Sequence, residues 1–175
     1  SFVIGRKSLL TEMVITHLTR ASLDPFRLIP RTYLIKSESY SDDIKALKML
    51  IAARWNYDFP LIIKPGEFSN RGNGIQMAYK ESELDHIVAE ILTQKDGTHT
   101  PHCAIVQNYI TNPLLYKERK FDMRCYALLI RSFGRLSCFW YGDGYARTSS
   151  YAYNTDNRDN LMVHLTNEAV QVKSK

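Results

Sequence analysis

The chain has 175 residues, 45% of them hydrophobic and 11% aromatic, which is enough to bury a core and excludes a disordered protein. Its net charge of +5 favours anionic partners, and no stretch of about 18 apolar residues is present that could span a membrane. The three cysteines are odd in number and widely spaced, so a disulfide framework is not expected. This favours a reducing compartment.

Apolar residues at helical spacing predict helices, and alternating ones predict strands. In chain order we expect a helix over 7–20, an extended piece over 28–35, a helix over 41–55 capped by Ser41 or Asp42, a strand over 59–65, a Gly-rich loop over 66–74, a strand over 75–79, a helix over 82–92 capped by Ser82, a strand over 104–110, and antiparallel strands over 120–147 with a turn at Phe133-Gly134-Arg135. The order lacks the regular strand–helix alternation of a doubly wound sheet. It therefore predicts an α+β fold with antiparallel sheets and packed helices.

The segment Lys120-Phe121-Asp122-Met123-Arg124 is the most informative part of the chain. In a strand, Lys120, Asp122 and Arg124 project from one face, because side chains alternate between faces. Three charged groups leading into an apolar run are costly unless they meet something charged. A bound nucleotide would satisfy all three. The alternative is an exposed edge strand with a salt-bridge ladder of these residues.

Basic residues are concentrated around this segment. Seven Lys or Arg residues and only three acidic residues lie between Asn112 and Arg147. Such a face suits phosphate or an acidic macromolecule. Because the window holds no recognised nucleic-acid-binding motif, a nucleic-acid partner is not expected.

A second candidate region begins where Lys64 ends an apolar strand and the Gly-rich loop follows. Glycines let backbone N–H groups approach phosphate oxygens, and the lysine adds positive charge. The loop is not a Walker A loop, and an ordinary hairpin loop is the alternative. Gln107, at the end of another strand, could present its amide to an adenine edge or simply cap the strand.

Two polar clusters come later in the chain. Arg147 lies among hydroxyls in 144–150, and His164-Leu165-Thr166-Asn167 is a compact polar group in an apolar setting. Each could instead be a turn with local side-chain caps. No metal site is expected, because no paired clusters of metal-ligating side chains are evident.

Five motifs follow one another along residues 4–171: Lys64-Pro65 with Gly72-Asn73-Gly74-Ile75, Val106-Gln107-Asn108-Tyr109-Ile110 with Pro113-Leu114-Leu115, Lys120-Phe121-Asp122-Met123-Arg124, Gly144-Tyr145-Ala146-Arg147-Thr148-Ser149-Ser150, and His164-Leu165-Thr166-Asn167 with Gln171. In this order, the motifs resemble the tubulin–tyrosine ligase-like family. The segment Pro30-Arg31-Thr32-Tyr33 also looks like the family's short stretch before its central domain.

The resemblance implies the ATP-grasp superfold, in which two α+β units clamp ATP between antiparallel sheets. It divides the chain into the end of an N-terminal region (1–34), a central ATP-grasp domain (35–110) and the start of a C-terminal ATP-grasp domain (111–175), which we expect to be incomplete. The start of the chain, without an initiator Met or a signal-peptide pattern, likewise leads us to expect a piece of a longer protein.

The resemblance also implies an activity. ATP would activate a carboxylate as an acyl-phosphate, and the amine of Glu, Gly or Tyr would attack it, so that the amino acid is ligated to tubulin or a similar acidic protein. The alternative is a non-catalytic relative that binds tubulin or nucleotide only, against which the intact Lys64, Asp122, Arg124 and Arg147 argue. A cytoplasmic protein of the cytoskeleton or cilium is expected.

The implied roles of individual residues agree with the charge pattern. Positioning and charge neutralisation carry most phosphoryl transfer, so no side-chain nucleophile is expected. By the resemblance, Lys64 would hold the α/β-phosphates under the loop of Gly72 and Gly74, while Gln107 and the backbone of Asn108, Tyr109 and Ile110 would read adenine. Lys120 and Asp122 would contact the ribose or phosphates. Arg124 and Arg147 would be catalytic and face the γ-phosphate and acyl-phosphate, and Thr166 and Asn167 would lie beside the same phosphates.

The sequence departs from the family pattern in two places. Asn108 stands where the family often has Lys, with little expected effect because the backbone makes much of the adenine contact. The family holds Mg²⁺ with acidic residues and an Asn on strands well after the His-Leu-Thr-Asn motif, and this sequence stops at Lys175. Metal ligands are therefore expected beyond Lys175, and catalysis is expected of the parent chain rather than of these residues alone.

Overall fold

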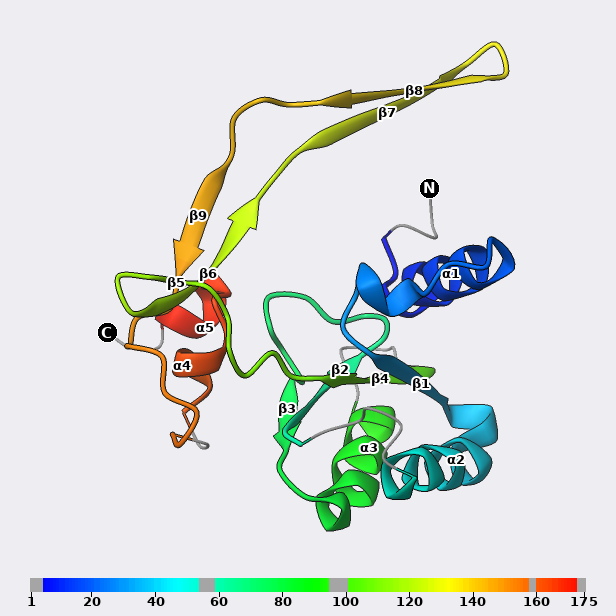
Figure 1. Cartoon of the computed structure of the whole chain (residues 1–175), viewed down its shortest axis with the longest axis vertical. Coiled ribbons are helices and arrows are strands. Elements are labelled where there is room, and N and C mark those ends of the chain that lie inside the picture. The colour runs from blue at the N-terminus through cyan, green and yellow to red at the C-terminus, as the bar shows by residue number, and fades with distance from the viewer. Residues whose placement is uncertain (1–4, 54–58, 95–100, 158–159, 173–175) are drawn as a thin grey trace. The chain divides into compact units, whose positions relative to one another are not determined.

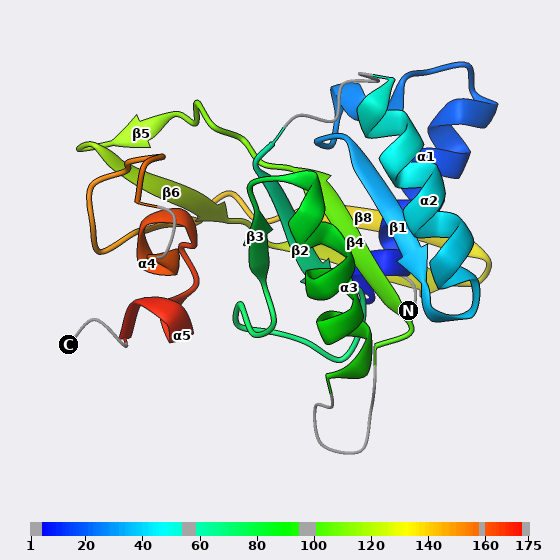
Figure 2. The ribbon, with the colours of Figure 1, turned by 90° about the horizontal axis from the view of Figure 1, so that it is seen from below.

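The computed structural model describes residues 5–53, 59–94, 101–157 and 160–172 (Figures 1 and 2). The chain divides into two compact units, Ser1–Thr111 and Asn112–Lys175. Among the described helices, none combines the length and apolar character needed to cross a bilayer.

The first unit is built on one antiparallel sheet with strand order β1-β4-β2-β3. Its elements are α1 (Lys7–Arg20), the 3₁₀ turn η1 (Pro25–Arg27), β1 (Thr32–Lys36), η2 (Ser37–Ser39), α2 (Tyr40–Ala52), β2 (Leu61–Pro65), β3 (Gln76–Ala78), η3 (Glu81–Glu83), α3 (Leu84–Thr93) and β4 (Cys103–Asn108).

The core of this unit lies on one face of the sheet. Alternate residues of β2 and β4 point to that face, and Leu61, Ile63, Ala104 and Val106 are fully buried there. They pack against the apolar sides of α2 and α3, while α1 lies on the opposite side of the sheet (Figure 1). Each fully buried aliphatic side chain contributes roughly 1.5–3 kcal/mol relative to an exposed one, so this layer holds the unit together.

The three predicted helices of this unit are confirmed, but the predicted caps are wrong. The turns η2 and η3 lead directly into α2 and α3, so Ser41 and Asp42 lie inside α2 and Ser82 lies inside η3. The start of α2 is instead tied down by Asp43, whose carboxylate accepts hydrogen bonds from the Lys36 amide at 2.9 Å and the Ser39 hydroxyl at 2.7 Å. The end expected for α2 at Trp55 lies outside the described residues.

The predicted strands of this unit are also confirmed, with bounds that differ by one to four residues. The extended piece over 28–35 becomes β1, which begins only at Thr32, after the turn η1 and Pro30. In register, Thr32 pairs with Gln107 and Ile62 pairs with Gln107, so β4 lies between β1 and β2.

The second unit contains a three-stranded antiparallel sheet, β5-β6-β9, and a separate hairpin of β7 and β8. Its elements are β5 (Leu115–Tyr116), β6 (Arg119–Arg124), β7 (Ala127–Ser132), β8 (Arg135–Trp140), β9 (Tyr145–Thr148), α4 (Leu161–His164) and α5 (Glu168–Gln171).

The hairpin turn predicted around Phe133 and Gly134 is confirmed. Ser132 pairs with Arg135, which leaves these two residues as the loop, and both have positive φ (46° and 77°). This is the conformation of a type I′ turn, whose twist matches that of the flanking strands.

The strand predicted over Lys120–Arg124 is confirmed as β6. It is the middle strand of its sheet, between β5 and β9, so the alternative of an edge strand is wrong. The ion pair also differs from the ladder considered above, because Asp122 pairs with Arg147 of β9 rather than with its own strand. The α+β fold with antiparallel sheets and packed helices is confirmed, whereas the division into three domains stays a prediction.

Candidate functional site

Lys64 and Gln107 meet on the face of the sheet opposite the buried core of the first unit. Lys64 Nζ donates to Gln107 Oε1 at 2.7 Å, and Gln107 Nε2 donates to Thr32 Oγ1 at 2.7 Å. Burial, together with a smaller contribution from the positive charge of Lys7, lowers the pKa of Lys64 to about 8. A lysine held in this way can bind an anion with little loss of side-chain freedom.

The two residues after Gln107 have their backbone donors engaged within the same unit. The amide of Asn108 donates to Arg31 O at 2.9 Å, and that of Tyr109 donates to Pro60 O at 3.2 Å. Tyr109 is 8% exposed and Ile110 is 53% exposed. The predicted adenine contacts of Gln107, Asn108, Tyr109 and Ile110 stay predictions.

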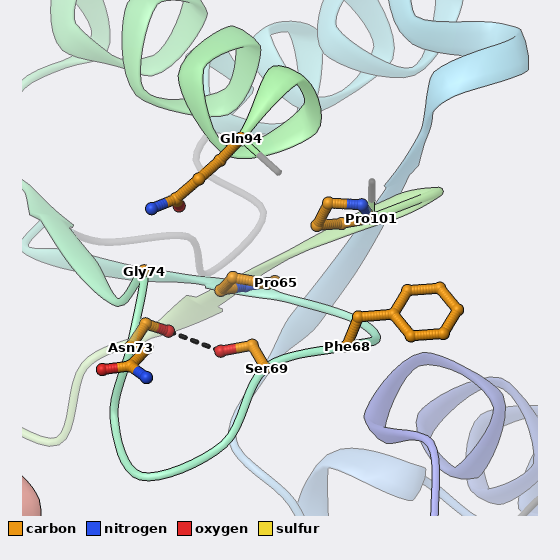
Figure 3. Close-up of a pocket in the computed structure, with 7 residues that line it drawn as sticks. All are labelled: Pro65, Phe68, Ser69, Asn73, Gly74, Gln94 and Pro101. Carbon is orange, nitrogen blue, oxygen red and sulfur yellow. Dashed lines mark hydrogen bonds between the residues drawn. The ribbon is translucent and has the colours of Figure 1, made fainter. Parts of the chain in front are cut away.

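The Gly-rich loop connects β2 to β3 and adopts left-handed backbone conformations. Gly72 and Gly74 have φ of 85° and 69°. A Cβ on Gly74 would lie 2.8 Å from Pro65 Cγ, so a side chain there would force the loop away from the strand. The loop borders a cavity of about 250 Å³, and the Ser69 hydroxyl donates to Asn73 O at 2.6 Å (Figure 3). The lining residues are Pro65, Phe68, Ser69, Asn73, Gly74, Gln94 and Pro101.

The first part of this loop is anchored by Glu67, to which the sequence analysis assigned no role. Its carboxylate accepts hydrogen bonds from the Ser8 hydroxyl of α1 and from the His102 amide, the latter at 3.1 Å. Ser8 is 4% exposed and Glu67 is 9% exposed. The anchor joins residues far apart in sequence, and a lone Ser or Glu carries no signal for it.

In the second unit, Asp122, Arg147 and Thr166 form one hydrogen-bonded cluster. Arg147 Nε and Nη2 donate to the two carboxylate oxygens of Asp122 at 2.9 and 2.8 Å, and the Thr166 hydroxyl donates to the same carboxylate. Burial alone would raise the pKa of Asp122, but these hydrogen bonds and the charges of Arg147 and Arg124 lower it on balance. The carboxylate therefore stays ionised and holds the guanidinium in place.

The remaining predicted residues of this unit lie around that cluster. Lys120 Nζ lies 5.8 Å from the ring centroid of Tyr153, whose ring in turn packs edge-on against the buried His164. Arg124, at the end of β6, is exposed, and Asn167 is the residue before α5. The structure thus brings Asp122, Arg147 and Thr166 into direct contact, while the ligand contacts of all these residues stay predictions.

Gln171 connects two parts of the second unit that are far apart in the sequence. Its Oε1 accepts from the Ser150 amide at 2.6 Å, and its Nε2 donates to Met162 O at 3.0 Å and to Leu165 O. These bonds hold the stretch from Met162 to Leu165, which directly precedes Thr166, beside Ser150 just after the end of β9. Gln171 is part of the family motif noted above, but that motif alone did not indicate this contact.

A metal ion is held by several His, Cys, Asp or Glu side chains that lie close together. Within residues 5–53, 59–94, 101–157 and 160–172, no group of three or more His, Cys, Asp or Glu side chains could hold one. The carboxylate of Asp122 is taken by Arg147 and Thr166. These residues as arranged do not fit a Mg²⁺ ion.

Comparison with known proteins places this arrangement in a family. The model of the tubulin-tyrosine ligase family matches residues 1–175. The mouse protein polyglycylase TTLL10 is 31% identical over 167 residues, covering 87% of this chain and 23% of that protein. A probable alpha-tubulin polyglutamylase, Ttll1 of Tetrahymena thermophila, is 33% identical over 146 residues, covering 82% of this chain and 33% of that protein.

Two further proteins are similar to this chain. The human protein named inactive polyglycylase TTLL10 is 32% identical over 144 residues, covering 78% of this chain and 21% of that protein. Among solved structures, the VanG D-Ala:D-Ser ligase of Enterococcus faecalis matches with a TM-score of 0.48 at 17% identity, covering 98% of this chain and 45% of that one.

The fold defines an α+β protein of antiparallel sheets, with a partly buried lysine in one unit and an Asp–Arg–Thr cluster in the other. The chain belongs to the tubulin-tyrosine ligase family. The resemblance to this family stated from the sequence is thereby confirmed. The chain spans 21–33% of the length of the three relatives named above.

Proposed function

We propose that the protein ligates an amino acid, Glu, Gly or Tyr, to tubulin or a similar acidic protein with the use of ATP. The observation that carries this proposal is the match of the family model over residues 1–175. The relatives named as a polyglycylase and a polyglutamylase favour Gly or Glu over Tyr. The basic window between Asn112 and Arg147 suits an acidic substrate.

The proposed reaction proceeds in two steps. A carboxylate oxygen attacks the γ-phosphorus of ATP, the bond to the β,γ-bridging oxygen breaks, and ADP leaves. The amine of the second substrate then attacks the acyl carbon, phosphate leaves with the acyl oxygen, and the nitrogen loses a proton as the amide forms. Negative charge develops on phosphate oxygens in both steps, and positioned cations stabilise it.

The residues of the first unit are proposed to hold the nucleotide. Lys64 would bind the α/β-phosphates as a cation, and the backbone of the loop with Gly72 and Gly74 would approach the same oxygens. The partial burial of Lys64 supports this role, because a lysine taken from water gains more from an anion than an exposed one does.

The residues of the second unit are proposed to act on the reacting phosphate. Arg147 is held by Asp122 and does not need to be ordered when a ligand arrives. Arg124 is proposed to face the acyl-phosphate, and Lys120 to contact the ribose or phosphates. Thr166 supports the Asp122 carboxylate, and Asn167 follows it in the chain.

Two parts of the proposal rest on the family alone. Mg²⁺ is proposed as a cofactor of the whole protein, bound by residues outside those described here. A cytoplasmic location on the cytoskeleton or in the cilium is proposed because tubulin is the named substrate of relatives.

The test uses the full-length protein with tubulin, ATP, Mg²⁺ and a mixture of Glu, Gly and Tyr, followed by intact-mass spectrometry of tubulin. The expected result is a mass increment of one of the three amino acids, lost in Arg124→Ala and kept in Arg20→Ala. Both arginines are exposed, but Arg20 ends α1 outside the proposed site. No increment with the unaltered protein, despite ATP binding, would contradict the proposal.

The second candidate function is a non-catalytic relative that binds tubulin or nucleotide only. The human relative named as an inactive polyglycylase supports it, because this chain is as similar to that protein as to the mouse polyglycylase. Binding of ATP that depends on Lys64, without any tubulin product, would favour this candidate.

A further inference from the structure

Three side chains form a hydrogen-bonded row across β1, β4 and β2. Thr32 pairs in register with Gln107, and Lys64 lies two residues along β2 from Ile62, the other partner of Gln107. Because side chains two residues apart share a face, all three project from the same side of the sheet. The row runs from Thr32 to Gln107 and from Gln107 to Lys64, with both hydrogen bonds at 2.7 Å.

The orientation of the Gln107 amide follows from its two neighbours. The Thr32 hydroxyl donates its proton to Pro30 O at 2.6 Å, so its oxygen is left to accept from Gln107 Nε2. With the amide nitrogen at Thr32, the amide oxygen faces the ammonium of Lys64. The flipped amide would place N–H donors against an ammonium that can only donate, so hydrogen-bonding chemistry selects one orientation.

This oxygen matters because the surroundings of Lys64 disfavour its charge. Burial is the largest cause of its lowered pKa, and the charged neighbour acting on it is Lys7 of α1, of the same sign. The carbonyl oxygen of Gln107 is an acceptor for the ammonium form and cannot donate to a neutral amine through that atom. It therefore favours the protonated lysine against both effects.

We infer that Gln107 is a positioning residue: held by Thr32, its side-chain oxygen fixes the Lys64 ammonium on the face of the sheet opposite the core and keeps it charged. The inference rests on the proposed function only for the identity of the anion that Lys64 would bind, the phosphates of ATP. It gives the Gln107 side chain a different role from the direct contact with adenine expected from the family resemblance, and it gives Thr32 a role that the sequence did not indicate.

The direct test is an NMR titration of the Lys64 side chain in the full chain, with isotope-labelled lysine and Lys64→Met for assignment. In Gln107→Met, which has similar length but no acceptor oxygen, the pKa of Lys64 is expected to fall. In Gln107→Glu, whose carboxylate attracts the ammonium, it is expected to rise. Thr32→Val should lower the pKa of Lys64 as Gln107→Met does, and Thr32→Ser should leave the pKa of Lys64 unchanged.

Opposite shifts of the Lys64 pKa in the two Gln107 variants cannot arise from loosened packing alone. An unchanged titration in both would overturn the inference.

A second measurement separates this inference from the proposed function. ATP affinity is measured against pH for the unaltered protein, Lys64→Met, Gln107→Met and Gln107→Glu. Gln107→Met should bind ATP roughly tenfold more weakly than the unaltered protein at pH 8, which is the loss expected for one hydrogen bond to a charged group. At lower pH, where Lys64 is protonated again, this variant should regain part of the lost ATP affinity. If ATP does not bind but Lys64 titrates as expected, the nucleotide assignment fails and the positioning role stands. If ATP binding depends on Lys64 and Gln107→Met binds equally well at every pH, the positioning role fails alone.

Discussion

Asp122 and Arg147 lie directly opposite each other on β6 and β9, and the carboxylate of the first accepts two hydrogen bonds from the guanidinium of the second. The two side chains are 34% and 26% exposed, so the pair is partly shielded from water. A bidentate pair fixes the plane of the guanidinium as well as its place. The proposed catalytic arginine is thus oriented by the strand register itself.

Replacing Asp122 with Asn should loosen Arg147 and destabilise the fold by about 1–2 kcal/mol, since a charge-assisted pair is lost from a partly exposed site. The pKa of Asp122 is lower in the folded protein than in the unfolded chain. Its contribution is therefore fully present above about pH 4 and is lost as the pH falls through the folded-state pKa. Urea unfolding measures the free energy of unfolding of Asp122→Asn and of the unaltered protein at pH 7 and at lower pH. The difference between the two proteins should become smaller as the pH falls. Asp156→Asn, at an exposed site, is the control.

Replacing Gln171 should release the end of β9. In Gln171→Leu all three hydrogen bonds are lost, whereas in Gln171→Glu the carboxylate can still accept from the Ser150 amide but cannot donate to Met162 O and Leu165 O. Hydrogen exchange of the Ser150 amide should accelerate in the Leu variant and stay slow in the Glu variant. Equal exchange rates in the two variants would contradict the assigned contact.

Gly144 and Gly142 offer a matched pair of glycines in the connection between β8 and β9. A Cβ on Gly144 would lie 2.6 Å from the backbone oxygen of Arg124, whereas one on Gly142 would meet nothing within 4 Å. Gly144→Ala should therefore lower the free energy of unfolding by about 1–3 kcal/mol, because the backbone must move to admit the methyl group. Gly142→Ala should be nearly neutral. Thermal unfolding of the two variants measures the difference, and similar losses of stability would count against the close approach.

Lys64 should make stability depend on alkaline pH. Its pKa is about 8 in the folded protein and near its ordinary value of 10.5 in the unfolded chain. Between these values the unfolded chain binds more protons, so the free energy of unfolding should rise with pH from about 8 to 10. Lys64→Met should lack this rise. The measurement is urea unfolding at several pH values, and parallel curves for the two proteins would contradict a lowered pKa of Lys64 in the folded protein.

The three cysteines should differ in reactivity. Cys103 is 4% exposed, and burial together with the charge of Glu67 raises the pKa of its thiol to about 12, whereas Cys125 and Cys138 are exposed. Since the thiolate is the reactive form, a thiol reagent at pH 8 should label Cys125 and Cys138 in the folded chain and Cys103 only after unfolding. Peptide mass spectrometry reads the result, and early labelling of Cys103 would contradict its burial.

Local patterns predicted the elements of the fold well. The spacing in Lys7–Arg20 and the alternation in β6 depend on neighbours in sequence, and both were predicted correctly. The caps were not, because η2 and η3 begin one turn before α2 and α3 and displace the Ser and Asp that would otherwise cap them.

The candidate site was predictable as a set of residues but not as a set of contacts. Lys64 and Gln107 are 43 positions apart, and Thr166 and Asp122 are 44 apart. Which side chains meet over such separations depends on strand register, which the sequence pattern alone does not define. For the same reason Thr32 and Glu67 carried no local signal of their contacts with Gln107 and Ser8.

The contacts of Gln171 have a practical consequence for where an expression boundary can be drawn. A shortened version that stops after Asn167 would keep every residue of the His-Leu-Thr-Asn motif and still lose the side chain that ties Met162 and Leu165 to Ser150. Such a truncation would look complete if only the His-Leu-Thr-Asn residues were checked. It would nevertheless leave Thr166 at a free end of the chain, with its hydrogen bond to Asp122 competing against fraying.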